Sequence, residues 1–213
     1  MTLRARLIDA YDVEWRSRVT FQQADFLGTV DVSRQSPIEG SYTGTDPMGL
    51  VWSAYGNGTS YAISLRPQPL FITAETDGKA AGLKVARTLL TDKIVSTDVR
   101  ERGLYGRFFR PATGGPVPGV LVLGSSDGGL APYVMQEAAL LAGHGFAALA
   151  LAYFYIGSLP DRLAGVPFEY FGGAIRWLQD QPLVRGDRLG VNGTSRGGEL
   201  ACFWGRTTQI SRP

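Results

Sequence analysis

The 213-residue chain has little of the side-chain chemistry that makes an enzyme recognisable, with one cysteine, Cys202, and one histidine, His144. A single cysteine excludes an intramolecular disulfide framework and fits a reducing compartment, so we expect a cytoplasmic protein. The N-terminus has no apolar segment of the kind that a secretory signal needs. The formal net charge of +2 is too small to indicate nucleic acid or an acidic membrane surface as a partner.

One segment has nearly the length and apolar content of a membrane span. Leu140–Leu159 reads LLAGHGFAALALAYFYIGSL, and a bilayer requires roughly 20 apolar residues. The Gly-His-Gly break at 143–145 divides it into the end of a helix and an apolar run. Phe146–Ile156 fits a strand buried on both faces of a parallel sheet, and we therefore expect no membrane partner.

The first 75 residues predict an all-β domain. Short segments rich in β-forming residues alternate with turn sequences and show no helical periodicity. The predicted strands are Leu3–Ile8, Trp15–Gln22, Gly28–Val32, Gly49–Ser53 and Ser60–Leu65. This spacing is typical of a small antiparallel, immunoglobulin-like sandwich. The segment offers no histidine and no cluster of metal-ligand type, so its expected role is packing or shaping a substrate site.

A transition follows, and we place the domain boundary near Asp92, giving domains 1–91 and 92–213. Ile94–Arg100 and Gly103–Arg110 read as paired strands. Beyond Pro111 strand and helix patterns alternate, which is the signature of a parallel sheet with crossover helices. The strands are Gly119–Leu123, Phe146–Tyr155 and Leu189–Asn192, and the helices are Tyr133–Ala142 and Phe168–Gln181. In such sheets the chemistry lies beyond the carboxyl ends of the strands, where both glycine-rich loops, 124–129 and 193–198, are expected.

The second of these loops carries the pattern around which the chain is organised. Gly193-Thr194-Ser195-Arg196-Gly197 lies between a predicted strand and a predicted helix, which is the setting of the nucleophile elbow of an α/β-hydrolase. The turn must be sharp enough to lift the hydroxyl of Ser195 above the sheet. Glycines on either side let the strand and the helix approach closely. The N–H of Arg196, at the start of the helix, is a natural donor to an oxyanion.

Longer stretches carry a family resemblance over nearly the whole chain. These are WRSRVTF at 15–21, GSYTGTDPMGLVWS at 40–53, GRFFRP at 106–111, PGVLVLGSSDGGL at 118–130, GFAALALAYF at 145–154, EYFGGAIRWL at 169–178 and LGVNGTSRGGEL at 189–200. The chain resembles the acyl-CoA thioesterase / bile acid-CoA:amino acid N-acyltransferase (BAAT) family. In that family a β-sandwich precedes an α/β-hydrolase domain.

The resemblance implies hydrolysis of fatty-acyl-CoA thioesters by a Ser–His–Asp triad, with acyl-CoA as the partner. A serine at the elbow, here Ser195, favours the thioesterase branch over acyl transfer to an amine. The N–H of Ser126 or Asp127 matches the second oxyanion donor. The family needs no metal and no cofactor beyond the CoA that the substrate carries.

The chain departs from the family pattern after the nucleophile, where hydrolases of this fold carry the acid and the histidine. Beyond Ser195 it has one carboxylate, Glu199, and no histidine. His144 is expected at the opposite end of the sheet, as a turn or capping residue. Cys202 is expected to pack in the core, and Asp46 and Asp127 to shape their turns.

Little or no turnover is therefore expected from this chain alone. The family's first sandwich strand should lie before Met1, and we expect a truncated or frameshifted product or one piece of a split hydrolase. The strand that ends at Ser195 is expected to form a bare sheet edge, through which the chain self-associates. The alternatives are a non-catalytic acyl-CoA-binding or interaction module and a general esterase or dienelactone-type hydrolase.

Overall fold

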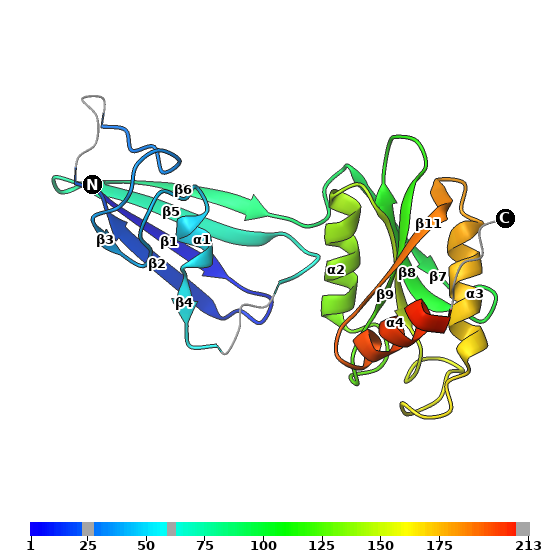
Figure 1. Cartoon of the computed structure of the whole chain (residues 1–213). Helices are drawn as coiled ribbons and strands as arrows, with labels where there is room; N and C mark the ends of the chain where they lie inside the picture. The colour runs from blue at the N-terminus through cyan, green and yellow to red at the C-terminus, as the bar shows by residue number, and fades with distance from the viewer. Residues whose placement is uncertain (23–27, 59–62, 208–213) are drawn as a thin grey trace. The chain divides into compact units, whose positions relative to one another are not determined.

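The computed structural model describes residues 1–22, 28–58 and 63–207, and the chain divides into two compact units, Met1–Thr88 and Leu89–Pro213 (Figure 1). Each unit contains one β-sheet with its own apolar core.

The first unit is an antiparallel sheet with strand order β3-β2-β1-β5-β6, and β4 pairs with β2. Its elements are β1 (Thr2–Ile8), β2 (Glu14–Thr20), β3 (Glu39–Gly40), α1 (Gly49–Trp52), β4 (Tyr55–Gly56), β5 (Gln68–Thr76) and β6 (Lys79–Arg87). The hairpin between β5 and β6 turns at Asp77 and Gly78, both at positive φ. This backbone is the one that two-residue hairpins favour, because its twist matches that of the strands.

Alternation of apolar residues explains which face of this sheet is buried. Leu3, Ala5 and Leu7 of β1 lie on one face, because side chains point alternately to opposite sides of a strand. Leu50 of α1 packs in the same core. Its carbonyl accepts a hydrogen bond from the buried hydroxyl of Ser17, at 2.6 Å. The short helix and its flanking turns therefore pack over the sheet.

Two of the strands predicted in this unit are wrong. Gly28–Val32 is not a strand, and Gly49–Ser53 contains the helix α1. The helical turn has a local cause: Asp46 accepts the N–H of Met48 with its carboxylate, at 2.7 Å, and the N–H of Gly49 with its carbonyl. An aspartate that binds the backbone ahead of it favours a turn over a strand.

The third predicted segment, Ser60–Leu65, lies partly outside the described residues, and its described part, 63–65, is not a strand. The described residues of the unit give one sheet, whereas a sandwich requires two. The immunoglobulin-like sandwich therefore stays a prediction.

The second unit has strand order β11-β9-β10-β8-β7. Its elements are β7 (Ile94–Val99), β8 (Tyr105–Pro111), β9 (Val117–Leu123), α2 (Pro132–Gly143), β10 (Ala147–Ala152), α3 (Phe168–Gln179), β11 (Val184–Gly193) and α4 (Arg196–Thr207). Strands β9, β10 and β11 are parallel, and β8 is antiparallel to β10. Figure 1 shows α2 on one face of this sheet and α3 and α4 on the other. The alternation of strand and helix agrees with the sequence pattern.

Strand β10 is the centre of this unit, and all six of its residues are buried. It pairs with β9 on one side and β8 on the other. The predicted buried strand is confirmed over Ala147–Ala152, whereas residues 153–156 lie beyond its end and Tyr155 is exposed. Among the described residues, no helix combines the length and the apolar content needed to cross a bilayer.

Core packing in this unit gives a direct prediction. Phe109 of β8 is fully buried, whereas Leu140 of α2 is half exposed. We expect Phe109→Ala to lower the free energy of unfolding by about 3–5 kcal/mol, through lost apolar contact and the cavity left behind. Leu140→Ala is the matched control and should change it by less than about 0.5 kcal/mol. Urea unfolding followed by circular dichroism measures both, and equal losses would contradict this description of the core.

Candidate active site

Ser195 stands at the junction of β11 and α4 in a conformation that few non-glycine residues adopt. Its φ is +52° and its side chain is exposed. A non-glycine residue in the left-handed region costs of order 1–3 kcal/mol and persists only where its surroundings hold it. The surroundings include a hydrogen bond from the N–H of Thr194 to the carbonyl of Leu123, at 3.1 Å. The carboxyl end of β9 therefore anchors the turn.

The two glycines of the pattern allow this turn to close. A Cβ on Gly193 would overlap the carbonyl of Gly197, across the turn. A Cβ on Gly197 would overlap the carbonyl oxygens of Leu123 and Gly124. Neither position accepts a side chain, because the atoms in the way are backbone. The close approach also places the elbow beside the start of the loop at 124–129.

Two tyrosines hold that loop in place. The N–H of Ser125 donates to the hydroxyl of Tyr133 at 2.6 Å, and this hydroxyl donates to the carboxylate of Asp127 at 3.0 Å. The buried hydroxyl of Tyr153 donates to the carbonyls of Gly124 and Ser125, at 2.7 and 3.1 Å. Burial raises the pKa of Tyr153 to about 12, so it remains a neutral donor at physiological pH.

These contacts leave backbone donors available at the tip of the loop. Within the described residues, the N–H groups of Ser126 and Asp127 have no hydrogen-bond acceptor. The N–H of Arg196 belongs to the first residue of α4, and the first N–H groups of a helix have no partner inside it. The structure thus brings Ser195, Arg196, Ser126 and Asp127 to the same end of the sheet. Such an arrangement offers a nucleophile and donors to a developing oxyanion.

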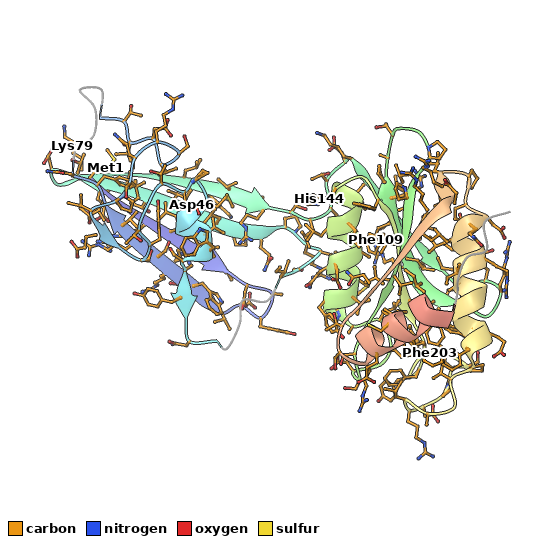
Figure 2. All side chains as sticks on the ribbon, viewed as in Figure 1. Met1, Asp46, Lys79, Phe109, His144 and Phe203 are labelled. Carbon is orange, nitrogen blue, oxygen red and sulfur yellow. The ribbon has the colours of Figure 1, made fainter. Side chains whose placement is uncertain are left out.

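The structure does not bring the only histidine to this end. His144 follows α2, where its Nδ1 lies 2.9 Å from the carbonyl oxygen of Leu140 (Figure 2). It precedes the amino end of β10, whereas Ser195 follows the carboxyl end of the parallel strand β11. The six residues of β10 alone span roughly 17 Å at about 3.3 Å per residue. His144 is a capping residue, as the sequence indicates.

Glu199 is also committed elsewhere. Its carboxylate pairs with the guanidinium of Arg196 at 2.8 Å on the exposed side of α4. This hydrogen bond raises the pKa of Arg196. Glu199 is therefore a partner of Arg196 on the helix surface, four residues beyond Ser195.

The prediction for Cys202 is wrong, and that for Asp46 agrees with the structure. Cys202 is exposed, because it lies three residues beyond the exposed Glu199 and so on the same face of α4. The carboxylate of Asp46 accepts the N–H of Met48 and also the indole N–H of Trp52, at 2.8 Å. Asp127 shapes its loop through Tyr133, as expected.

Sequence reasoning missed the two tyrosines and a polar contact beneath the elbow. The amide of Asn192 donates to the carboxylate of Glu137 at 2.6 Å, linking β11 to α2. No spacing in the sequence pairs these residues, since the contact joins positions 55 apart. The sequence indicates a role for Tyr133 and Tyr153 only weakly. Tyr133 begins a predicted helix soon after the glycine-rich loop, and Tyr153 lies near the carboxyl end of a predicted strand, which is the end of the sheet where this loop is expected.

The geometry defines a class. A sheet with three adjacent parallel strands and crossover helices on both faces, and a serine at positive φ between a parallel strand and a helix, are features of an α/β-hydrolase. A family model described as the acyl-CoA thioester hydrolase/BAAT N-terminal region matches residues 1–101. A second, the BAAT/acyl-CoA thioester hydrolase C-terminal model, matches residues 166–210. The chain belongs to the acyl-CoA thioester hydrolase/BAAT family.

Curated relatives are similar in sequence to this chain over nearly its full length. Acyl-coenzyme A thioesterase 1 of Rattus norvegicus is 35% identical over 94% of this chain and 49% of its own length. The mitochondrial acyl-coenzyme A thioesterase 2 of Homo sapiens is 33% identical, with 94% and 43% covered. The peroxisomal succinyl-coenzyme A thioesterase of Mus musculus is 32% identical, with 94% and 49% covered. The chain spans about half the length of these relatives.

A solved structure, the dienelactone hydrolase-like promiscuous phosphotriesterase P91 from metagenomic libraries, is 26% identical, with a TM-score of 0.43. It covers 54% of this chain and 55% of its own.

The close approach at Gly197 predicts a large effect of one methyl group. We expect Gly197→Ala to destabilise the second unit and to displace the elbow, because the new Cβ meets the carbonyls of Leu123 and Gly124. Gly173→Ala in α3 is the matched control: nothing lies within 4 Å of its Cβ position, and the change should stabilise the helix by up to about 1 kcal/mol. Thermal unfolding compares them, and a Gly197→Ala protein as stable as the control would contradict the geometry.

Tyr153 gives a prediction in pH. Its folded pKa of about 12 lies above the unfolded value of about 10, so its stabilising contribution is full below about pH 10 and disappears as the pH rises through 12. We expect Tyr153→Phe to cost about 1–3 kcal/mol at pH 7, since two loop carbonyls lose a buried donor. The free energy of unfolding of the Tyr153→Phe protein should then fall less steeply than that of the wild type between pH 10 and 12. Urea unfolding across this range measures both slopes, and identical slopes would refute the assignment.

Proposed function

We propose that the chain carries the nucleophile and the oxyanion donors of an acyl-CoA thioester hydrolase. The observation that supports this most directly is the strained, exposed Ser195, held beside the loop at 124–129 through the bond from Thr194 to Leu123. Strain in an exposed polar residue, maintained by rigid neighbours, is characteristic of functional sites. The names of the relatives supply the substrate class, acyl-CoA.

In the proposed reaction the Oγ of Ser195 attacks the carbonyl carbon of the thioester. The oxygen of that carbonyl becomes an oxyanion, which accepts hydrogen bonds from the N–H of Arg196 and from the N–H of Ser126 or Asp127. The C–S bond then breaks, the proton of the serine hydroxyl passes through solvent to the sulfur, CoA leaves as the thiol, and the acyl group remains on the serine as an ester. Water hydrolyses this ester and releases the free acid. No step uses a metal or a cofactor other than the CoA of the substrate.

We also propose that this chain by itself hydrolyses acyl-CoA at a low rate. A serine hydroxyl at neutral pH is a poor nucleophile without an adjacent general base. The only histidine in the sequence lies at the opposite end of the sheet, and Glu199 is paired with Arg196. Oxyanion donors and binding alone supply roughly 10³–10⁴-fold over the reaction in water. Neither His144 nor Glu199 is therefore proposed as the acceptor of the proton of Ser195.

This observation also favours a second candidate, a non-catalytic acyl-CoA-binding module, of which one half of a split hydrolase is a variant. In either case the site binds the thioester and holds its carbonyl without completing the hydrolysis.

Three further assignments belong to this proposal. Two domains are proposed, 1–91 and 92–213, with a boundary close to that between the two compact units. The first domain is proposed to be an immunoglobulin-like sandwich, and the protein is proposed to be cytoplasmic. Self-association is proposed through β11, the edge of its sheet in the described residues. A register shift between Arg185 and Leu189 interrupts this edge, which confines regular pairing to Leu189–Gly193. Sedimentation at several concentrations tests it.

The proposed role of Ser195 is tested by supplying the missing base. We expect purified chain with palmitoyl-CoA to release CoA slowly, and added imidazole to raise the release, because imidazole in solution accepts the proton of the hydroxyl. Ser195→Ala should show only the release that imidazole gives in the absence of protein. A thiol reagent that reports free CoA measures all four conditions.

Ser33→Ala, which removes an exposed serine of the first unit, is the control and should behave as wild type. Imidazole-stimulated release that persists in Ser195→Ala would exclude Ser195 as the nucleophile. Fast release without imidazole would refute the low rate. Binding of palmitoyl-CoA with no release under any condition would favour the binding module.

A further inference from the structure

The solvent face of the sheet in the first unit carries a square of four arginines. Strand β1 contains the sequence LRARL and β2 contains WRSRV, and in both strands buried residues alternate with arginine. The two strands are antiparallel neighbours, and their register places Arg4 opposite Arg18 and Arg6 opposite Arg16. The Cα atoms of opposite residues lie about 5 Å apart in such a pair, and those of alternate residues along a strand lie about 7 Å apart.

Two carboxylates on the same face pair with three of these arginines. Glu14 pairs with Arg6 at 3.3 Å and also with Arg16, and the hydrogen bond from Arg16 lowers the pKa of Glu14. Glu75 pairs with Arg4 at 3.2 Å. All five side chains are partly exposed to solvent, and exposed ion pairs contribute little to stability. The two carboxylates therefore offset the charge of the square only in part.

The fourth arginine, Arg18, is exposed and forms no ion pair with any residue that the structure describes. It faces Arg4 across the strand pair, and like charges directly opposite each other destabilise a sheet. Folding alone therefore gives no reason for this arginine. Conflicts of this kind with a local rule are expected at functional sites. An anion bound over the two strands removes the conflict.

Aromatic side chains lie on both sides of the square, in one row across the sheet. Tyr55 of β4 is paired with Arg16 and is 71% exposed. Phe71 of β5 is paired with Arg6, whose guanidinium lies 4.0 Å from the centre of the ring. Lys84 of β6 follows Phe71 in the same row and adds a further cation. The ring of Phe71 is therefore covered by cations, whereas the ring of Tyr55 is open to a ligand.

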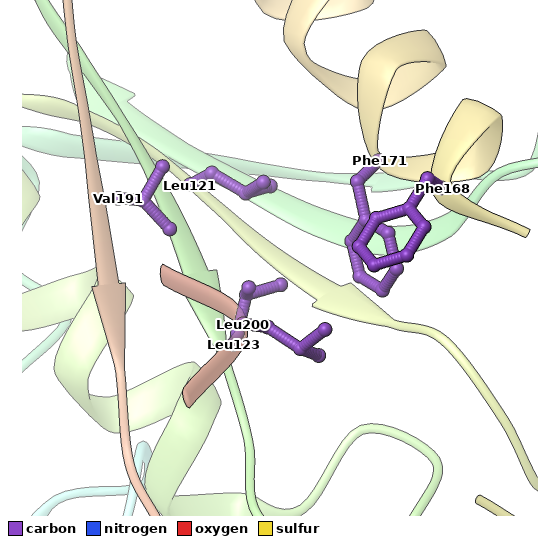
Figure 3. A pocket seen from close by; sticks show the side chains of 6 residues that line it. All are labelled: Leu121, Leu123, Phe168, Phe171, Val191 and Leu200. Carbon is purple, nitrogen blue, oxygen red and sulfur yellow. The ribbon is translucent and has the colours of Figure 1, made fainter. Parts of the chain in front are cut away.

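The carboxylates around the square limit the size of the anion. Glu14 lies before the square on β2, and Glu39 and Glu75 lie beyond its other end, on β3 and β5. A nucleic acid strand or a membrane surface would extend over these carboxylates, whereas a ligand with two phosphate groups fits between them. Guanidinium groups bind phosphate in a bidentate geometry, and bases stack on open aromatic rings. Figure 3 shows, by contrast, a cavity of the second unit that is lined by apolar side chains alone.

We propose that the arginine square and Tyr55 bind a nucleoside diphosphate. The phosphate groups lie on the guanidinium groups, Arg18 among them, and the base stacks on the ring of Tyr55. None of these residues belongs to the candidate active site, so the inference does not rest on the proposed function. It assigns a ligand to the first unit, for which the sequence indicates only packing or the shaping of a substrate site.

Calorimetric titration of the full chain with ADP tests this site, with inorganic pyrophosphate and adenosine as partial ligands. We expect ADP to bind more tightly than pyrophosphate. Arg18→Gln should weaken the binding of both about tenfold, because each loses a charge-assisted hydrogen bond. Tyr55→Ala should weaken only ADP, again about tenfold, through the loss of stacking on the base. Tyr55→Phe keeps the ring and should bind ADP as the wild type does, and adenosine alone should bind far more weakly than ADP.

Arg34→Gln is the matched control. Arg34 is an exposed arginine of the first unit that lies in a turn outside the sheet, and its replacement should leave the affinity for ADP unchanged. Without ligand, Arg18→Gln should unfold at a temperature no lower than that of the wild type, because it relieves the repulsion with Arg4. This measurement separates lost binding from lost folding, and the Tyr55 variants carry their own control in pyrophosphate.

An affinity for ADP that changes equally in Arg18→Gln and Arg34→Gln would overturn the site, as would equal affinities for ADP and pyrophosphate. Binding of CoA without binding of ADP would overturn it too. The same holds for binding of phosphatidylserine vesicles or of single-stranded RNA in place of ADP. None of these outcomes bears on Ser195, because the imidazole experiment reports on the nucleophile independently.

Discussion

The close approach of the elbow to the end of β9 is the constraint on which the candidate site depends. Gly197 lies against the carbonyl oxygens of Leu123 and Gly124 with no room for a side chain. The N–H of Thr194 binds the same Leu123 carbonyl. These contacts hold Ser195 at positive φ and set the first N–H groups of α4 beside the neighbouring loop. The parallel pairing of β9 with β11 thus determines where the turn at Ser195 lies relative to the loop at 124–129.

The topology that builds this site also excludes the histidine from it. In a parallel sheet every strand-to-helix turn lies at one end and every helix-to-strand turn lies at the other. A histidine can therefore act on Ser195 only if it lies in or near a turn at the same end of the sheet. His144 caps α2 just before β10, and Ser195 follows β11. No side-chain rotation spans the length of a strand. In the described residues the exposed Ser195 and the loop at 124–129 therefore lie at one end of the sheet, and His144 lies at the other.

The sequence predicts the second unit well because local and long-range signals agree there. The apolar run at 146–156 indicates a buried strand. The spacing of Phe171, Ile175 and Leu178 indicates a helix with one apolar face, and the glycines around Ser195 indicate a sharp turn. The first unit is less predictable: Gly49–Ser53 has strand-like composition, but the carboxylate of Asp46 starts a helical turn. Cys202 shows another limit of prediction from sequence. Helical spacing tells which residues share a face of a helix, but it does not tell whether another element covers that face. Tyr133 and Tyr153 act through tertiary contacts that no periodicity encodes.

The apolar stripe of α3 continues beyond the buried part of the helix. In sequence Phe168 continues the spacing of Phe171, Ile175 and Leu178, and nothing distinguishes it from a core residue. In the structure Phe171 is buried and Phe168 is half exposed. The ring of Phe168 stacks on that of Phe203 in α4, which is also half exposed. Helical spacing thus identifies the apolar face of α3, and the tertiary structure decides how much of that face is covered.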